Sequence, residues 1–296
     1  MALYAAVDFE APARDSTEPA IRVRFLQSVR WRLPVSEPPR QRPRSAIESL
    51  IVIAVVVAVG AAAFAYTAGW LSPNRLTPQR LVDAFSPPSG PALGHRRNHA
   101  KGICFKGMFE SNGAGSELSR AFAFSKGSYP VVGRFNLGTP DADAADATVR
   151  VRGLGVQISA PDGQEWRMAL INPPFFAVSN PDGFFALLQA SASKDPNAMP
   201  ELIKVHPEIA DFDAWAKSAP WTGSYAEEQY NSLDAFIFTD ASGASHPMRW
   251  SLLPAAQPVP VPVEELAKRG PNFLEEEIVQ RIKSGPARWT MVVSFS

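Results

Sequence analysis

The stretch from His95 to Gly107, HRRNHAKGICFKG, decides how the rest of the sequence is interpreted. It sets His99 among Arg96, Arg97 and Lys101 and then passes into a short apolar run. From the residues alone, a histidine beside three basic residues indicates a solvated basic loop.

The histidines and the single cysteine limit the metal chemistry of the chain. His95 and His99 stand in HxxxH spacing, but glycines flank the pair and no carboxylate or third ligand is near in sequence. Cys104 is the one cysteine, which excludes an internal disulfide framework and a CxxCH haem-attachment site. We therefore expect no metal site built by protein side chains in this stretch.

Downstream of this stretch, short apolar runs separated by Gly, Pro, Asp and Asn predict an antiparallel barrel or sandwich. The strands expected are Ile103–Phe109, Val131–Leu137, Thr148–Ser159, Trp166–Ile171, Ala235–Thr239, Arg249–Leu253 and Trp289–Ser294. Helices are expected over Pro181–Ala190, His206–Ser218 and Glu264–Lys283, the last of them broken at Gly270-Pro271.

Upstream, residues 50–71 carry no charge and match the roughly 20 apolar residues that cross a bilayer. We predict a transmembrane anchor over 47–71, after a basic, proline-rich arm over 1–46 and before a linker over 72–91. The positive-inside rule then predicts a single-pass membrane protein whose main domain, 92–296, lies on the periplasmic or extracytoplasmic side. A buried core helix and a cleaved signal peptide, cut near Ala63-Phe64-Ala65, are the competing interpretations.

The overall charge is balanced, with 29 basic and 29 acidic residues, so nothing argues for a nucleic-acid partner. The lipid bilayer is the partner that the apolar segment predicts, and a membrane-tethered adaptor is an alternative role. The oligomeric state is not indicated by the sequence.

Several motifs, in the same order and spacing, resemble those of the catalase superfamily. Residues 96–102, followed by Gly107, Phe109 and Glu110, are similar to the distal-histidine segment of haem catalases. The other matching segments are Val132-Gly133-Arg134-Phe135, Asp146 through Arg152-Gly153, Asn172-Pro173-Pro174-Phe175-Phe176 with Phe184, and Gly69-Trp70-Leu71, which looks like the boundary of the anchor in small catalase-related peroxidases.

This resemblance implies an α+β fold, a catalase-like antiparallel β-barrel with flanking helices after one N-terminal transmembrane helix. It implies a haem b cofactor and a peroxidase that reduces hydrogen peroxide or organic peroxides with small electron donors. His99 would be the acid-base catalyst, and Arg96 and Arg134 would bind the haem propionates. The resemblance also implies that three phenylalanines wall the haem pocket: Phe135, Phe176 and Phe184.

The sequence departs from the family pattern at three places. Asn136 stands where a serine usually follows the Arg-Phe pair, and its amide can still make a hydrogen bond. An aliphatic residue, Leu170 or Ile171, falls in the register of the distal asparagine, so Asn172 is not carried over; we therefore expect weak or no catalase activity.

No Arg-x-x-x-Tyr sequence for a proximal haem ligand is found, which predicts a chain truncated at its C-terminus. The alternative function is accordingly a haem-poor, non-catalytic barrel, either a remnant or a binding module for apolar ligands.

Overall fold

The computed structural model describes residues 46–72, 75–86 and 93–295. Its contacts divide the chain into two units, one ending at Leu71 and the other beginning at Ser72. The basic arm expected over 1–46 lies outside the described residues, apart from Ala46.

Among the described residues of the first unit there is one helix, α1 (Ala46–Thr67), which includes residues 50–67 of the apolar run expected to cross a membrane. Its 22 residues have a mean hydropathy of 2.5 over the most apolar window, and none of that window is buried. At 1.5 Å per residue the helix is about 33 Å long, close to the thickness of the hydrocarbon core. Length and composition therefore suit a membrane span, and a signal sequence meets the same criteria.

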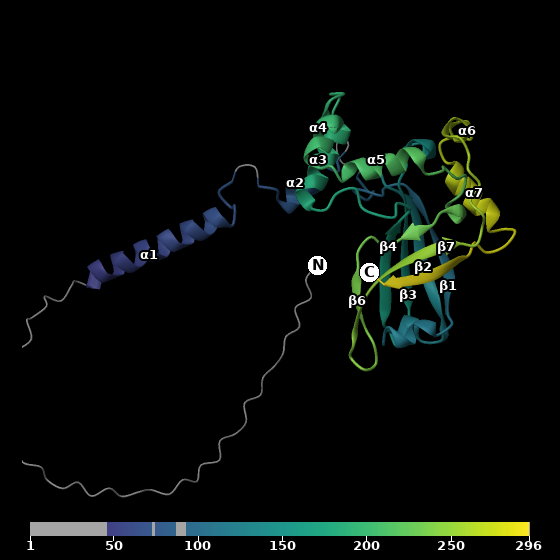
Figure 1. The fold of residues 1–296 in the computed structure, drawn as a ribbon, viewed down its shortest axis with the longest axis horizontal. Coiled ribbons are helices and arrows are strands. Elements are labelled where there is room, and N and C mark those ends of the chain that lie inside the picture. Colours follow the sequence, from purple (N-terminus) through teal and green to yellow (C-terminus); the bar gives the residue numbers. More distant parts are fainter. Residues whose placement is uncertain (1–45, 73–74, 87–92, 296) are drawn as a thin grey trace, which may run out of the picture. The chain divides into compact units, whose positions relative to one another are not determined.

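The second unit is built on an eight-stranded antiparallel sheet that curls into a half-barrel (Figure 1). Pairing follows the order β1-β2-β3-β4-β5-β7-β6, and β8 pairs with the other edge of β7. Within the described ranges no pairing joins β8 to β1, so the sheet is an open half-barrel. The strands are β1 (Gly102–Ser111), β2 (Gly127–Leu137), β3 (Arg152–Ser159), β4 (Glu165–Ile171), β5 (Tyr230–Asn231), β6 (Phe236–Thr239), β7 (Ser245–Pro254) and β8 (Trp289–Phe295).

The helices that flank the sheet gather at one of its ends, opposite the β6–β7 hairpin (Figure 1). Two of them begin with a side-chain cap followed by proline: Thr77 caps α2 and Asn180 caps α3. The predicted break at Gly270-Pro271 is confirmed, because α6 ends before it and α7 begins after it. The bounds are α2 (Pro78–Asp83), α3 (Pro181–Ala192), α4 (Ala198–Val205), α5 (Ile209–Ser218), α6 (Val263–Ala267) and α7 (Phe273–Arg281).

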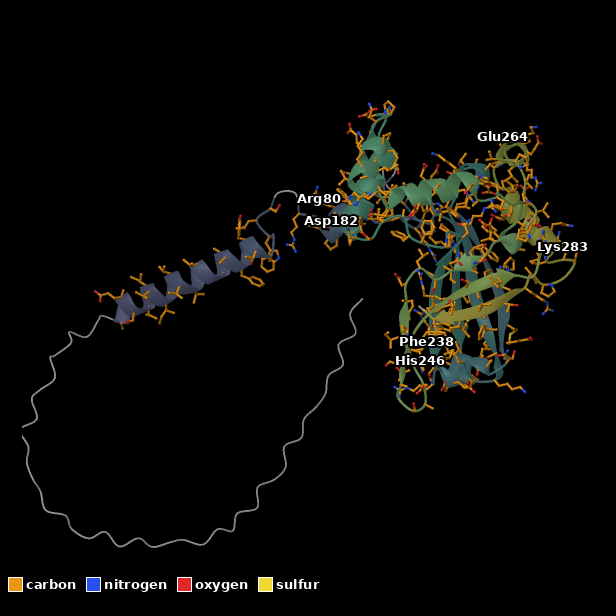
Figure 2. All side chains as sticks on the ribbon, in the orientation of Figure 1. Arg80, Asp182, Phe238, His246, Glu264 and Lys283 are labelled. Atoms are coloured by element: carbon orange, nitrogen blue, oxygen red, sulfur yellow. The ribbon has the colours of Figure 1, made fainter. Side chains whose placement is uncertain are left out.

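Apolar side chains that alternate along the strands form the core on the concave face of the sheet. In β2, Val131, Phe135 and Leu137 are buried there, whereas Arg134 and Asn136 lie on the opposite face. Cross-strand pairs continue to the far hairpin, where Phe238 pairs with His246, as labelled in Figure 2. The sheet therefore presents two chemically different faces.

The strand and helix predictions differ from the structure at four points. Strand β5 has only two residues and was not predicted, and neither was helix α4. Helix α2 was not predicted either, since it lies within the expected linker. The strand expected from Thr148 begins only at Arg152, because residues 146–148 form a 3-10 turn.

Candidate active site

His99 lies just before β1, where that strand begins beside the end of β2. Gly102 pairs with Asn136 in the sheet. A Cβ atom at Gly102 would lie 2.1 Å from the carbonyl oxygen of Phe135, so only glycine permits this close approach of the two strands. The close approach brings the His99 segment against the two polar residues of β2, Arg134 and Asn136.

The backbone of His99 is in the left-handed region, with φ at 54°, the one positive φ of a non-glycine residue among those the structure describes. Its amide donates to Oδ1 of Asn98 at 2.9 Å. Arg134 donates from Nη1 to the carbonyl oxygen of His99 and from Nη2 to that of Ala100, both at 2.8 Å. One guanidinium thus bridges two successive peptide groups and stabilises the strained turn.

The ring of His99 is held by a second contact from the same strand. Its Nδ1 atom lies 2.6 Å from Oδ1 of Asn136. The Nδ2 group of Asn136 donates to the carbonyl oxygen of Arg134 at 3.3 Å, which turns Oδ1 towards the ring. Nε2 of His99 has no hydrogen-bond partner in the part of the chain that the structure describes, so this nitrogen is available to a ligand.

The surroundings keep the imidazole neutral. Burial lowers the pKa of His99 below 6.5, the hydrogen bond that its ring makes to Oδ1 of Asn136 acts in the opposite direction, and the positive charges of Arg134 and Arg96 lower the pKa further. The pKa of Arg134 is also lowered, first by burial and then by Arg96. A neutral base beside two guanidinium groups can accept a proton while an anion is held nearby.

The segment after His99 is anchored to α7 by a buried ion pair. Nζ of Lys101 lies 2.7 Å from Oδ1 of Asp146, and it also donates to the carbonyl oxygens of Ala144 and Pro271. The other carboxylate oxygen of Asp146 accepts the amide N–H of Leu274 in the first turn of α7. These contacts fix the base of the His99 turn.

Phe135 lies away from His99, although it was expected among the haem-binding residues. Its side chain is only 4% exposed and stacks between Phe105, at 4.7 Å between ring centroids, and Tyr225, at 5.0 Å. Because neighbouring residues of a strand point to opposite faces, Phe135 faces the core and Arg134 faces the His99 turn. The two residues of the Arg-Phe motif therefore have different surroundings, the His99 turn for Arg134 and the core for Phe135.

Phe176 and Phe184 form a separate aromatic group. Their ring centroids are 5.1 Å apart, and Phe184 also packs on Phe85 at 5.7 Å. The guanidinium group of Arg80 in α2 also lies over the ring of Phe185 in α3. These contacts connect α2 with α3, in which Arg80 and Asp182 are labelled in Figure 2. Phe176 is 47% exposed, which leaves a large apolar surface open to a ligand.

Asn172 has a structural role, in keeping with its omission from the expected site. Its Oδ1 accepts the amide N–H of Arg152 at 2.9 Å and its Nδ2 donates to Glu228 at 3.1 Å. Arg152 and Glu228 form a buried ion pair at 2.7 Å. Leu170, one of the two aliphatic residues in the register of the distal asparagine, is buried in the core.

The three tyrosines of the second unit make no hydrogen bond to the His99 turn in the part of the chain that the structure describes. Tyr225 and Tyr230 are buried in the core, and burial raises the pKa of both phenols. Tyr129 donates to the carbonyl oxygens of Phe122 and Ser125, and Tyr66 belongs to α1. The described residues also contain no group of three or more His, Cys, Asp or Glu side chains that could hold a metal ion.

Comparison with known proteins assigns this arrangement to a family. The family model described as Catalase matches residues 64–295, which is most of the chain. The chain belongs to the catalase family. Both the His99 segment and the Arg134 segment lie within the matched region.

Two relatives are similar to the chain in sequence, and one solved structure is similar to it in fold. A catalase-related peroxidase of Synechococcus elongatus is 30% identical over 253 residues, covering 83% of this chain and 73% of the relative. A catalase-related peroxidase of Mycolicibacterium paratuberculosis is 28% identical over 224 residues, covering 75% of this chain and 72% of the relative. A fungal catalase has the same fold, with a TM-score of 0.61 at 16% identity; the match covers 69% of this chain and 43% of the fungal catalase.

The sequence did not reveal two contributors to this catalase-family site. Asn98 precedes His99 and accepts its amide, a contact typical of asparagine in tight turns. Gly153 of β3 faces Asn136, and a Cβ atom there would lie 2.3 Å from Oδ1 of Asn136. Gly153 lies in the Arg152-Gly153 segment that resembles the family, but its contact with Asn136 follows only from the register of β2 with β3.

Proposed function

We propose that this chain is a haem b-dependent peroxidase that reduces hydrogen peroxide or organic peroxides, with small molecules as electron donors and with weak or no catalase activity. The observation that carries the proposal is the geometry of His99, whose Nδ1 is held by Asn136 and whose Nε2 is open beside two guanidinium groups. The names of the two relatives support the same class of reaction.

The side chains at this site fit the distal face and the edge of a haem. Propionates are anionic, and planar guanidinium groups bind carboxylates well. Arg96 is exposed and close enough to lower the pKa of both His99 and Arg134. Arg134 uses one N–H of each terminal nitrogen for the His99 turn, which leaves further N–H groups for a carboxylate.

The aromatic group of Phe176 and Phe184 would supply apolar contacts to a haem. Phe176 and Phe184 together present an apolar surface, and Phe176 is half exposed. Burial of such a surface by an apolar macrocycle contributes to its retention. Phe135 acts indirectly, as core packing beneath β2.

In the proposed mechanism the haem, when bound, supplies the redox chemistry that peroxide cleavage needs. Nε2 of His99 accepts the proton of the incoming peroxide and returns it to the departing oxygen, which becomes water or an alcohol. Asn136 and Arg134 hold the ring and the backbone of His99 during this transfer. Burial first, and then the positive charges of Arg134 and Arg96, lower the pKa of His99 and so favour the neutral imidazole that can accept this proton.

Substitution of His99 by asparagine tests this function. Asparagine tolerates the left-handed backbone better than most residues, so the imidazole is removed with little added strain. In the haem-loaded full chain we expect peroxide turnover to fall by about 10²–10⁴-fold while the Soret band stays. His95→Asn, an exposed change in the same turn, is the control. Turnover within twofold of the unsubstituted chain in His99→Asn would contradict the proposal.

A haem-poor, non-catalytic role is the second candidate. It is motivated by the three tyrosines of the second unit, none of which makes a hydrogen bond to the His99 turn among the described residues. Haem titration of the purified chain separates the two functions. A Soret band that saturates at one equivalent supports the peroxidase, and no band at any ratio supports a remnant or a binding module for other apolar ligands.

We also propose that α1 anchors the chain as a single-pass membrane protein with the catalytic domain on the extracytoplasmic side. The support is the uncharged run over residues 50–71, most of which lies in α1, together with the eight arginines that precede the helix in the sequence. The lipid bilayer is then a permanent partner of the chain.

A further inference from the structure

We propose that Asn136 is a positioning residue that locks His99 in the tautomer with its proton on Nδ1, and that Gly153 is the residue that makes room for it. The inference deepens the proposed function, because it explains how Nε2 is kept as the proton acceptor. The two ring nitrogens are not equivalent, and the partner of one nitrogen decides the protonation of the other.

The first step is the orientation of the Asn136 amide. Its Nδ2 group donates to the carbonyl oxygen of Arg134 at 3.3 Å, which leaves Oδ1 directed at the ring of His99 at 2.6 Å. A carbonyl oxygen only accepts hydrogen bonds. At this distance Nδ1 must therefore carry the proton, and in a neutral ring Nε2 then carries none.

The second step is the contrast between an amide and a hydroxyl at this position. A serine hydroxyl can donate or accept by rotating its hydrogen, so it is compatible with either tautomer. The Asn136 amide has no such freedom, because it is 6% exposed and both of its ends are bonded. Asn136, which departs from the family pattern, therefore restricts the tautomer of His99 more than a serine would.

The third step is the space that the amide occupies. Gly153 pairs with Asn136 in the sheet, on the same face. A Cβ atom at Gly153 would lie 2.3 Å from Oδ1 and 3.1 Å from Cγ of Asn136. No real side chain tolerates such contacts, so any residue with a Cβ at 153 displaces the amide away from the ring.

Gly155 provides a matched control two residues along the same strand. A Cβ atom there would meet nothing closer than the carbonyl oxygen of Arg134, at 4.0 Å. Gly155→Ala therefore adds the same methyl group to β3 without touching Asn136.

The test is the tautomer of His99, read by long-range ¹H–¹⁵N correlation in the full chain in detergent micelles, with ¹⁵N-labelled histidine and no haem. The His99→Asn variant identifies the signal among the four histidines. We expect the Nδ1–H form alone in the unsubstituted chain and in Gly155→Ala. In Asn136→Ala and Gly153→Ala we expect loss of that form as the sole species and the appearance of Nε2–H.

Asn136→Asp serves as the conservative rescue, because a carboxylate oxygen in the same place also accepts from Nδ1. We expect the Nδ1–H form to be retained in this variant, with a higher pKa of His99. If the unsubstituted chain shows the Nε2–H form, or if the tautomer is the same in all five proteins, the proposal is overturned. Should Asn136→Ala fail to fold, Gly153→Ala against Gly155→Ala decides the question.

The inference and the proposed function fail separately. The tautomer is measured without haem, so its result does not depend on turnover. If His99 is found only as the Nδ1–H form and the chain binds haem but does not turn over peroxide, the peroxidase function is contradicted and the role of Asn136 is supported. If the chain turns over peroxide but His99 is not held in the Nδ1–H form, the role of Asn136 is contradicted and the peroxidase function is supported.

Discussion

Lys101 and Asp146 form an ion pair with 2.7 Å between Nζ and Oδ1, and their side chains are 11% and 2% exposed. The pair fastens the segment that follows His99 to the start of α7, because Asp146 also accepts the amide N–H of Leu274. The position of the catalytic turn thus depends on a contact between segments that are distant in the sequence.

We therefore expect Asp146→Asn to be strongly destabilising. It leaves the ammonium of Lys101 buried without its counter-charge, and breaking a buried pair in this way costs about 3–5 kcal/mol. Asp213→Asn, which removes an exposed pair with Lys217, should cost about 0–1 kcal/mol. Urea unfolding followed by tryptophan fluorescence measures the free energy of unfolding of both variants. Equal decreases in the two variants would show that the Lys101–Asp146 pair stabilises the fold no more than an exposed pair does.

Arg134→Lys should loosen the His99 turn. A lysine offers one ammonium where the guanidinium reaches two carbonyl oxygens, so at least one charge-assisted hydrogen bond, worth about 1.5–3 kcal/mol, is lost. We expect faster amide hydrogen exchange over residues 98–101, measured without haem. Arg167→Lys, at an exposed pair with Glu165, is the control. Unchanged exchange in Arg134→Lys would mean that the turn is held by other contacts.

The lowered pKa of His99 makes the folding stability depend on pH. The folded-state pKa lies below the unfolded value of 6.5, so between the two the unfolded chain binds more protons and stability rises with pH. This contribution is fully present above pH 6.5 and is lost as the pH falls towards the folded pKa. The sign follows from burial first, and then from the positive charges of Arg134 and Arg96.

Arg96→Gln should accordingly raise the pKa of His99, because it removes one of the positive charges that lower it. A ¹H titration of the imidazole signal measures the change directly. Arg97→Gln is the matched control, since Arg97 pairs with Asp83 and is not among the charges that act on His99. An equal shift in both variants would point to a general charge effect rather than to the proximity of Arg96.

Much of the fold and part of the site could be predicted from the sequence, for physical reasons that differ between elements. The strands with regular apolar alternation were found, but the two residues of β5 are too few to show a period. Helix α4 was missed because Pro200 argues against a helix; in the structure it lies in the first turn, where its missing N–H has no cost.

The site shows the same division between local and long-range signals. His99 and Arg134 were recognised because each lies in a contiguous motif. Phe135 was assigned to the pocket with its neighbour Arg134, although strand geometry places the two side chains on opposite faces. The contact between Gly153 and Asn136 arises only from the register of β2 with β3, which no local pattern encodes.

The membrane anchor can be tested with charges in the middle of α1. Val55→Arg with Val57→Arg adds about 2.5–3.5 kcal/mol for each arginine at the centre of a bilayer, so we expect the chain to leave the membrane fraction. Thr67→Arg is the control, because it lies at the end of the helix, where the side chain can reach the membrane interface; this variant should stay in the membrane fraction. Mass spectrometry of the mature chain checks the alternative; a start just after Ala65 would show a cleaved signal sequence instead of an anchor.

The last prediction separates the two roles that phenylalanine has near the site. Phe135 is 4% exposed and packed between two aromatic rings, so Phe135→Ala should cost about 3–5 kcal/mol of folding stability through the cavity it leaves. Phe176 is 47% exposed and touches Phe184 on one side only, so Phe176→Ala should lower stability by less than about 1 kcal/mol. Its loss should instead weaken haem binding, because the surface that a haem would cover is removed. Urea unfolding gives the first quantity and a Soret titration gives the second. If Phe176→Ala binds haem with an unchanged Kd, this aromatic group is not part of the pocket, and other residues must supply the apolar contacts of the cofactor.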